Sequence, residues 1–308
     1  MDWTMKPVTI ENRKEIEQYT ALRPVCTAEG QFLYHYIWGD YHHMRYHAED
    51  DFLCMFIDSA EQVPGIIMPF CREDKLVEVF FRIKEYFNSE LHLPLHMFLA
   101  DKLTLGILEG DKRFVKQFSY EEDRDCFDYV YDAEKLRRLS GKKYHKKKNH
   151  LNAFLREYKE RYEYRSLDET NLEEILDLYG RWERQHQDKD RYHTVETELK
   201  GMKKIVHNYQ KLSCKMGGIY IDGRLEAFSI GSYIPSIKCA YIHMEKADTR
   251  YPGLYTLINQ QFLQHAFSEA KYVNREDDLG QEGLRKAKMS WHPIYLAEKY
   301  YVREKNKI

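Results

Sequence analysis

The sequence is short of residues that interrupt or cross-link a chain, with 8 prolines, 15 glycines and 6 cysteines among 308 residues. It has no low-complexity segment and no linker rich in Pro, Gly or Ser, which excludes a disordered or collagen-like chain. The cysteines form no Cys-x-x-Cys pair, so the usual structural zinc sites are excluded. We therefore expect six reduced, mostly buried thiols and no metal centre.

Long hydrophobic runs are absent as well. No apolar stretch approaches the roughly 18–20 residues that a membrane-spanning helix needs. Residues 1–10 also lack the apolar core of a signal peptide. The sequence therefore predicts a cytoplasmic protein without a membrane span.

Neither sign of charge dominates, because 48 Lys and Arg residues balance 50 Asp and Glu residues to a net charge of -2. This balance excludes a protein that is basic over its whole surface, as many nucleic-acid binders are. The sequence also lacks a phosphate-binding G-x-x-x-x-G-K, a Rossmann glycine motif and a Ser-His-Asp order. With 43% hydrophobic and 32% charged residues, it has the composition of one large globular domain or two of ordinary size.

The chain does contain a regular succession of apolar patterns typical of strands and helices. In the first half, the patterns predict strands at 52–58, 65–71, 95–100 and 126–131 and helices at 74–88 and 103–109. In the second half, they predict helices at 170–182, 199–209, 254–270 and 282–289 and strands at 218–221, 225–233, 238–245, 272–274 and 295–302. Thr170-x-x-Glu173 is a capping-box pattern for the first of these helices, and Asp222-Gly223 is a hairpin signal.

Both halves thus present a similar order of elements. This order predicts an α/β fold in which each half has a mixed sheet with helices on its faces. We place the domains at 1–150 and 151–308. A single large α/β domain stays open as the simpler alternative.

A candidate donor-binding loop lies within 241–259, where Arg250 and Gly253 separate a predicted strand from the helix that follows. The first N–H groups of a helix have no partner within it, and this positive end attracts an anion such as pyrophosphate. A glycine in the loop lets the anion approach the backbone closely. Arg250, Gly253, Leu254 and Tyr255 are therefore candidate donor-binding residues, although an ordinary strand-loop-helix turn has the same pattern.

Three carboxylates at strand ends are candidate catalytic groups. Glu245 ends the strand beside the donor loop and is the candidate general base. Glu276 and Asp278 follow the predicted strand 272–274, and residues two apart on a strand point the same way. We expect these two carboxylates to orient the acceptor or an aminoacyl ammonium group.

Polar and cationic residues around these carboxylates are candidate substrate-binding groups. Asn274 ends the predicted strand, and Arg285 and Lys288 lie three residues apart on one face of the next predicted helix. Cations placed there are suited to hold a phosphate or a carboxylate. A structural ion-pair network has the same pattern and stays open as the alternative.

Positive charge is concentrated between residues 135 and 161, which hold eleven Lys or Arg residues and only two Glu. Such a patch favours phosphate-bearing partners. Tyr144, Phe154 and Tyr158 are interleaved with the charges and are predicted to stack on bases. A solvated helix face is the alternative. The candidate phosphate-binding lysines are Lys142, Lys143, Lys146 and Lys147.

These stretches resemble one known family. Asn274-x-Glu276-x-Asp278-x-Gly280, then Gly283-Leu284-Arg285, Lys288, Ser290 and Pro293, is similar to the signature of the phosphatidylglycerol lysyltransferase C-terminal-domain family. Similar upstream stretches are Glu245-Lys246-Ala247 with Gly253, Tyr255, Ile258-Asn259 and Phe262, and Ser140-Gly141-Lys142-Lys143-Tyr144-His145-Lys146-Lys147 with Asn149-His150, Asn152 and Phe154. The donor loop resembles the acyl-CoA pyrophosphate loop of GNAT acyltransferases, Q/R-x-x-G-x-G/A, with Tyr255 at its last position.

The resemblance implies two tandem GNAT-like acyltransferase domains, as in the Fem-type aminoacyltransferases. It implies an enzyme that moves an acyl or aminoacyl group from an acyl-CoA or aminoacyl-tRNA donor to an amine or hydroxyl acceptor, without a metal. The acceptor is then a small molecule, a lipid head group or a peptide, and the basic run 135–161 meets the phosphates of CoA or tRNA.

Two other functions stay open. One is an acyl-CoA N-acetyltransferase that acts on a small amine. The other is a non-catalytic module that binds RNA or phosphate through the basic run.

Overall fold

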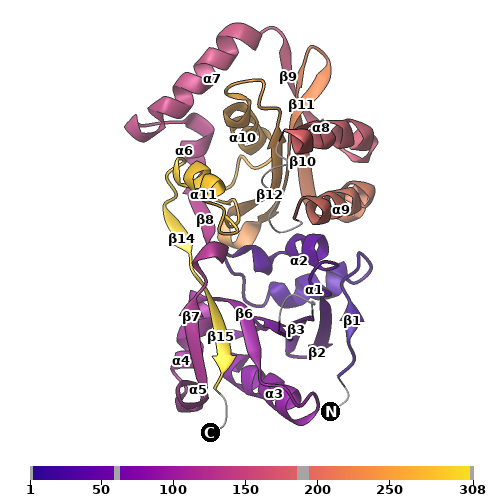
Figure 1. Cartoon of the computed structure of the whole chain (residues 1–308), viewed down its shortest axis with the longest axis vertical. Helices are drawn as coiled ribbons and strands as arrows, with labels where there is room; N and C mark the ends of the chain where they lie inside the picture. Colours follow the sequence, from indigo (N-terminus) through magenta and orange to yellow (C-terminus); the bar gives the residue numbers. More distant parts are fainter. Residues whose placement is uncertain (1–2, 59–62, 186–193, 306–308) are drawn as a thin grey trace. The chain divides into compact units, whose positions relative to one another are not determined.

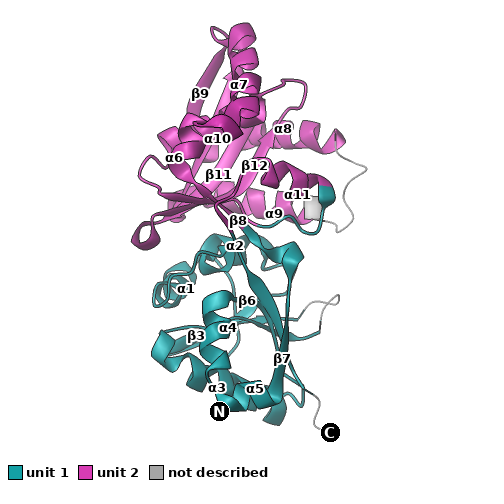
Figure 2. Ribbon diagram, turned by 90° about the vertical axis from the view of Figure 1, so that its left-hand side faces the viewer, with its two compact units in different colours: residues 1–128, 277–282, 296–308 teal, residues 129–276, 283–295 magenta. Residues whose placement is uncertain are grey.

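The computed structural model of the chain describes residues 3–58, 63–185 and 194–305 (Figure 1). The chain forms two compact units (Figure 2). The first unit contains residues 1–128, 277–282 and 296–308, and the second contains residues 129–276 and 283–295. The division between the units thus follows residue 128, whereas the sequence-based boundary at 150 falls inside helix α7 (His145–Tyr158). This helix packs against α10 (Leu254–His265) of the second unit and belongs with it.

The first unit is built on a mixed sheet of strand order β1-β2-β3-β4-β6-β15-β7, with β5 paired to β3. Within it β4 and β6 are parallel, and the other described neighbours are antiparallel. Its strands are β1 (Lys6–Pro7), β2 (Arg45–Glu49), β3 (Phe52–Ile57), β4 (Gly65–Ile67), β5 (Phe70–Cys71), β6 (His96–Asp101), β7 (Phe118–Glu122) and β15 (Lys299–Glu304). Its helices are α1 (Arg13–Thr20), α2 (Phe32–Trp38), α3 (Leu76–Ser89), α4 (Lys102–Glu109) and α5 (Lys112–Gln117).

Two elements show why this unit folds as the apolar patterns indicate. All six side chains of β3 are buried, as expected for a continuous apolar run covered on both faces. On α3 the apolar residues recur every three or four positions and are all buried; they are Leu76, Val79, Phe80, Ile83 and Phe87. Burying each such side chain contributes roughly 1.5–3 kcal/mol, so this stripe docks the helix on the sheet.

A fully buried ion cluster joins three distant segments of the first unit. The Lys299 ammonium lies 2.7 Å from both Glu29 Oε1 and Asp128 Oδ1, and all three side chains are inaccessible. Asp128 Oδ2 also accepts the backbone N–H of Ala28 at 2.7 Å, whereas Glu29 Oε2 has no hydrogen-bond partner among the described residues. Burial raises the pKa of Glu29 to about 7, because Lys299 offsets only part of the desolvation and Asp128 adds repulsion.

Stability is therefore expected to rise on mild acidification through Glu29. A carboxyl whose pKa is higher in the folded than in the unfolded chain binds its proton preferentially when folded, so its contribution grows as pH falls from about 7 towards 4.5. The full effect is at most about 3 kcal/mol. Urea unfolding of wild type and Glu29→Gln at pH 5, 6 and 7 measures it. Identical pH dependence in the two proteins would contradict the prediction.

The second unit has a mixed sheet of strand order β14-β8-β13-β12-β11-β10-β9. Its strands are β8 (Asp128–Asp132), β9 (Tyr162–Leu167), β10 (Cys214–Ile221), β11 (Arg224–Ile234), β12 (Cys239–Ala247), β13 (Tyr272–Asn274) and β14 (Tyr295–Ala297). Its helices are α6 (Ala133–Arg138), α7, α8 (Leu172–Arg184), α9 (Thr194–His207), α10 and α11 (Glu282–Met289). β12 and β13 are parallel, and the α/β class with two mixed sheets is confirmed.

The predicted hairpin forms between β10 and β11. Asp222 and Gly223 have φ values of +50° and +81°, the left-handed conformations that a tight two-residue turn requires. Consecutive residues of β12 face opposite sides of the sheet: Glu245 lies beside α10, whereas the Lys246 ammonium lies 3.9 Å from the Trp182 ring of α8. The sheet is therefore covered by α10 on one face and by α8 on the other.

Two details of the second half differ from the sequence-based expectation. The capping box at α8 uses Asp168 and Asn171 and not Thr170 and Glu173, because a short 3-10 turn precedes the helix. The expected strand 295–302 is two strands, β14 and β15, which join different sheets. The apolar pattern is continuous across both, so it could not reveal the break.

Candidate active site

Polar side chains gather where two parallel strands of the second unit separate. β12 and β13 pair only over residues 239–241 and 272–274. β12 then continues, whereas the Arg275 backbone turns to β8 and donates its N–H to Tyr129 O at 3.0 Å. Side chains from β12, from the turn after β13 and from α10 meet beyond this point.

Glu245 of β12 is held there in a buried ion pair. Arg275 Nη2 donates to Glu245 Oε1 at 2.7 Å, and the side chains of Arg275 and Glu245 are only 13% and 6% exposed. Burial raises the pKa of Glu245, and the charge of Arg275 and the nearby Asn259 amide offset only part of this rise. A carboxylate with a raised pKa is a better proton acceptor near neutral pH.

Four buried polar atoms at this place have no hydrogen-bond partner among the described residues. They are Glu245 Oε2, Asn259 Nδ2, Asn259 Oδ1 and Arg275 Nη1. The Asn259 amide is near enough to affect the pKa of Glu245, yet neither of its atoms reaches hydrogen-bond geometry. A buried polar group without a partner costs about 1–3 kcal/mol, so such groups are rare and need a reason. A polar ligand that bonds to several of them at once supplies one.

The turn after β13 aims a second carboxylate at β12. Glu276 has φ +56°, an unusual value for a residue with a long side chain. Asn274 stabilises this turn, because its Oδ1 accepts the Glu276 backbone N–H at 2.6 Å. Glu276 Oε1 then lies 2.7 Å from His243 Nδ1 on β12. Backbone strain of this kind costs on the order of 1–3 kcal/mol and concentrates at functional sites.

The expected pairing of Glu276 with Asp278 is wrong in geometry. Asp278 belongs to the first unit, where it contacts Arg124 Nη1 at 3.4 Å and accepts the Gly280 backbone N–H at 3.0 Å. The alternation of side chains holds only within a strand. β13 ends at Asn274, and the left-handed turn at Glu276 breaks the alternation before Asp278.

Two cations of α11 occupy different surroundings. The Lys288 ammonium donates to the Arg275 backbone carbonyl at 2.7 Å and so supports the turn that carries Arg275 and Glu276. Arg285 is half-buried on the same helix. Lys288 therefore acts on the site through the backbone in this structure.

Sequence reasoning missed three residues of this site: His243, Asn259 and Arg275. Asn259 and Arg275 lay inside the stretches that resemble the family but carried no role. Their significance comes from side chains of β12, α10 and the turn after β13 meeting, which no local pattern reports.

At the centre of the basic run, residues 142–148, the lysines are unpaired among the described residues and exposed except for Lys147, whereas Lys135, Arg137, Arg138 and Arg161 nearer its ends form ion pairs. Its lysines lie on the turn before α7 and on the first residues of that helix, and none of their side chains forms a hydrogen bond or ion pair with a described residue; they are Lys142, Lys143, Lys146, Lys147 and Lys148. Lys147 is half-buried and its ammonium lies 4.3 Å from the Trp291 ring. Desolvation, with repulsion from Arg275 and Lys146, lowers the pKa of Lys147 to about 8.

The predicted base-stacking role is wrong for two of the three interleaved aromatic residues. Tyr144 is 3% exposed and its hydroxyl donates to the Trp291 carbonyl at 3.0 Å, while Phe154 is 1% exposed. Both anchor the run to the core. Their periodicity reflects packing, which leaves the charges as the accessible part of the run.

Comparison with known proteins identifies the family. A family model described as "Phosphatidylglycerol lysyltransferase, C-terminal" matches residues 24–303. The chain belongs to this family. An uncharacterised protein of Mycoplasmoides gallisepticum is 26% identical over 175 residues, which are 57% of this chain and 55% of that protein, so the match spans about half of the relative's length.

Solved structures confirm the fold predicted from the family resemblance. A conserved protein of unknown function from Bacteroides thetaiotaomicron is 28% identical, with TM-score 0.89 over 99% of this chain and 100% of that one. The C-terminal domain of a putative lysylphosphatidylglycerol synthetase from Agrobacterium fabrum is 12% identical, with TM-score 0.66 over 97% and 93%. FemX is 9% identical, with TM-score 0.66 over 98% of both chains. These structures cover nearly the whole of this lysyltransferase-family chain, so both of its α/β units belong to the shared fold.

In the candidate donor loop of this family member, the polar side chains are already bonded to other side chains of the protein. Arg250 makes a two-point ion pair with Asp248, which is buried in the same loop. Burial raises the pKa of Asp248, but the hydrogen bonds from Arg250 and Gln185 outweigh it and hold the pKa at about 2. Tyr255 accepts the Trp182 ring N–H at 2.9 Å, and Leu254 is buried. The Asp248 carboxylate is thus buried and bonded to Arg181 as well as Arg250, and the Arg250 guanidinium that the sequence assigned to an anion is already paired within the loop.

Packing and backbone conformation both require a glycine at residue 253. A Cβ there would lie 2.5 Å from the His150 carbonyl oxygen of α7, and φ is +94°. We expect Gly253→Ala to lower the free energy of unfolding by about 1–3 kcal/mol from backbone strain alone, with the clash adding to it. Gly223→Ala is the control, because Gly223 has φ +81° with no atom near its would-be Cβ. Equal losses in urea unfolding would show that packing on α7 plays no part.

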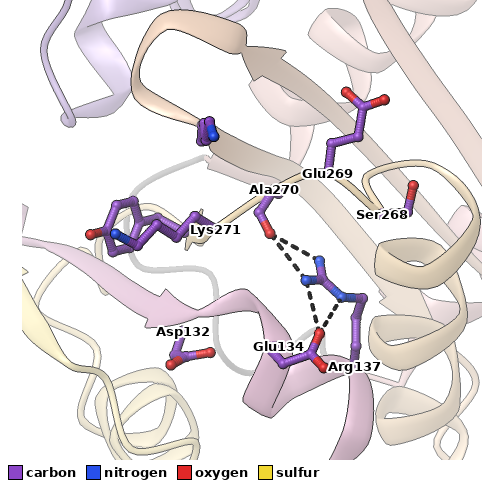
Figure 3. A pocket seen from close by; sticks show the side chains of 9 residues that line it. Asp132, Glu134, Arg137, Ser268, Glu269, Ala270 and Lys271 are labelled. Carbon is purple, nitrogen blue, oxygen red and sulfur yellow. Dashed lines mark hydrogen bonds and ion pairs between the residues drawn. The ribbon is translucent and has the colours of Figure 1, made fainter.

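A surface pocket elsewhere in the second unit contains side chains that hold the fold together. It encloses about 430 Å³ beside the start of β13. Figure 3 shows that Arg137 in it bonds to Glu134 and to the Ala270 carbonyl. Its guanidinium thus fastens α6 to the loop before β13, away from the residues 275–276 that turn toward β12.

Membrane-spanning helices and metal-binding clusters are absent from the described residues. No helix within residues 3–58, 63–185 and 194–305 is long and apolar enough to cross a membrane. Over the same part of the chain, no cluster of three or more His, Cys, Asp or Glu side chains has the arrangement of a metal site.

Proposed function

We propose that the protein transfers an aminoacyl group from tRNA to an amine or hydroxyl acceptor, at the place where β12 and β13 separate. The observation that carries the proposal is the group of unpartnered buried atoms on Glu245, Asn259 and Arg275. They comprise acceptors and donors side by side, which suits a reacting centre that carries both an N–H and a carbonyl.

The chemistry follows from these atoms. The acceptor nitrogen or oxygen attacks the ester carbonyl carbon, and its proton passes to Glu245 Oε2. Asn259 Nδ2 and Arg275 Nη1 donate to the carbonyl oxygen as it becomes negative. Each such donor is worth on the order of 10²–10³ in rate. The tetrahedral adduct then expels the ribose oxygen of the tRNA, which takes the proton from Glu245 and leaves as a hydroxyl. Holding both reactants together supplies much of the remaining acceleration.

Glu276 supplies the recognition of an aminoacyl group. Its Oε2 makes no hydrogen bond to a described residue, and the side chain is 16% exposed. An ionised carboxylate there is suited to bind the α-ammonium of the donor. A simple acyl group such as acetyl has no ammonium to offer it, which favours an aminoacyl donor.

The cationic groups available to bind phosphate also favour tRNA over CoA. The four exposed, unpaired lysines of residues 142–148 offer an extended positive surface, whereas Arg250 of the donor loop is already paired with Asp248. The loop therefore has less free positive charge for a pyrophosphate. The name of one related structure, a putative lysylphosphatidylglycerol synthetase, supports a lipid head group as acceptor.

Hydroxylamine is a surrogate acceptor that tests the donor without knowledge of the natural acceptor. The protein is incubated with hydroxylamine and either tRNA charged with a labelled amino-acid mixture or acetyl-CoA. We expect enzyme-dependent aminoacyl hydroxamate from tRNA above the uncatalysed background. Acetyl hydroxamate alone would favour the N-acetyltransferase, and tRNA binding without either product would favour a non-catalytic RNA-binding module.

A further inference from the structure

A chain of hydrogen bonds links β11, β12 and the turn after β13 in the second unit. Ser232 Oγ of β11 lies 2.7 Å from His243 Nε2 of β12, and His243 Nδ1 lies 2.7 Å from Glu276 Oε1. Both imidazole nitrogens are thus engaged by side chains. Such a chain orients each of its members.

A β-bulge makes this chain possible. In the β11–β12 ladder, Ile230 pairs with Met244 and Gly231 with Ile242, so His243 is the extra residue on β12. A bulge redirects a side chain that regular alternation would place elsewhere. His243 therefore lies beside Ser232, which pairs with Tyr241 one step along the ladder.

The exposure of the three side chains shows which end of this hydrogen-bond chain a substrate can reach. In a nucleophilic Ser-His-carboxylate triad, the serine faces the substrate and the carboxylate is the buried end. Here Ser232 is 4% exposed and the His243 side chain is fully buried, whereas the Glu276 side chain is 16% exposed. The end that a substrate reaches is therefore the carboxylate.

The strained turn supports the same direction. Glu276 adopts its left-handed conformation with the Asn274 side chain bonded to its backbone N–H. The turn and His243 together fix one carboxylate oxygen and leave Oε2 without a described partner. The arrangement restrains Glu276 from both its backbone and its side chain.

We infer that His243 and Ser232 are positioning residues that hold Glu276 as a substrate-binding carboxylate. The inference rests on the proposed function for the role of Glu276, which is to bind a positively charged amino group. His243 donates its Nδ1–H to Glu276, and its Nε2 accepts the Ser232 hydroxyl hydrogen. The imidazole thus keeps the carboxylate aimed, with Ser232 selecting the tautomer.

The tautomer is measured directly by NMR of the full chain with ¹⁵N-labelled histidine, assigned with His243→Gln. At neutral pH we expect His243 to carry its hydrogen on Nδ1, with Nε2 unprotonated. Ser232→Ala removes one hydrogen bond and is expected to leave a mixture of tautomers. A hydrogen on Nε2 in the wild type would mean that His243 donates to Ser232, so that these hydrogen bonds run in the opposite direction. That result would overturn the inference.

Two replacements of His243 separate positioning from packing. His243→Asn places an amide N–H near the position of Nδ1 and keeps a donor for Glu276. His243→Gln reaches towards Ser232 and lacks that donor. Both alter the same buried site, and circular dichroism checks that both are folded. A structural role predicts similar behaviour of the two variants.

Alaninamide is the probe for the amino-group site, and N-acetylalaninamide is its uncharged control. Binding is followed by the backbone amide signals of residues 274–277. We expect alaninamide alone to bind, Glu276→Gln and His243→Gln to weaken it about tenfold or more, and His243→Asn to stay within about threefold of wild type. Equal binding by both histidine variants, or no response of the wild type to alaninamide, would overturn the inference. The expected pattern in a protein that forms no aminoacyl hydroxamate would retain the inference and reject only the transfer.

Discussion

Glu245→Gln is expected to lower kcat/KM for aminoacyl transfer to hydroxylamine by about 10²–10³-fold, because the glutamine cannot take the proton of the attacking group. The replacement keeps an oxygen that accepts the Arg275 hydrogen bond, so the site keeps its shape. The loss of a charged hydrogen bond is expected to cost about 1–3 kcal/mol of stability. Initial rates of hydroxamate formation, normalised to folded protein, measure the effect.

Glu226→Gln is the matched control for this experiment. Glu226 is also a buried glutamate of the same sheet, 2% exposed and paired with an arginine, Arg181. We expect it to lose comparable stability with normal transfer by the folded fraction. If Glu245→Gln keeps normal turnover per folded molecule, Glu245 is not the base and the buried pair is structural.

Replacing the four exposed lysines of residues 142–148 with glutamine is expected to weaken tRNA binding on the order of 10²-fold at 0.1 M salt. The residues are Lys142, Lys143, Lys146 and Lys148. Each phosphate contact contributes about 0.7–0.9 to the slope of log K against log salt, so the slope should become shallower by about three to four. Fluorescence anisotropy with uncharged tRNA over a range of KCl concentrations gives both quantities. Lys147 is left in place because it packs on Trp291.

The control removes the same amount of charge elsewhere. Lys14, Lys102, Lys112 and Lys116 are exposed lysines of the first unit. Their replacement by glutamine makes the same change in net charge, and we expect a smaller change in both affinity and slope. Similar effects in the two variants would assign tRNA binding to overall charge and reject a defined contact through the basic run.

The family and the order of elements were predictable because they depend on local patterns. The sequence predicted the 3.6-residue periodicity of α3, the Asp222-Gly223 turn and the bounds of α11 at 282–289. It also predicted the basic run, since charge density needs no knowledge of the fold. Its aromatic residues were misinterpreted, because the same spacing serves a buried anchor such as Tyr144 and an exposed stacking platform.

The sequence by itself determined that this chain has two α/β domains of a known family, with carboxylates at strand ends and a concentrated run of basic residues. Only the tertiary structure decided which of these groups form a site. The separation of β12 from β13 brings Asn259 and Arg275 to Glu245, a bulge turns His243 towards Ser232, and a left-handed turn parts Glu276 from Asp278. Each outcome depends on where regular pairing stops. That point is set by packing between residues far apart in the chain, which local periodicity does not encode.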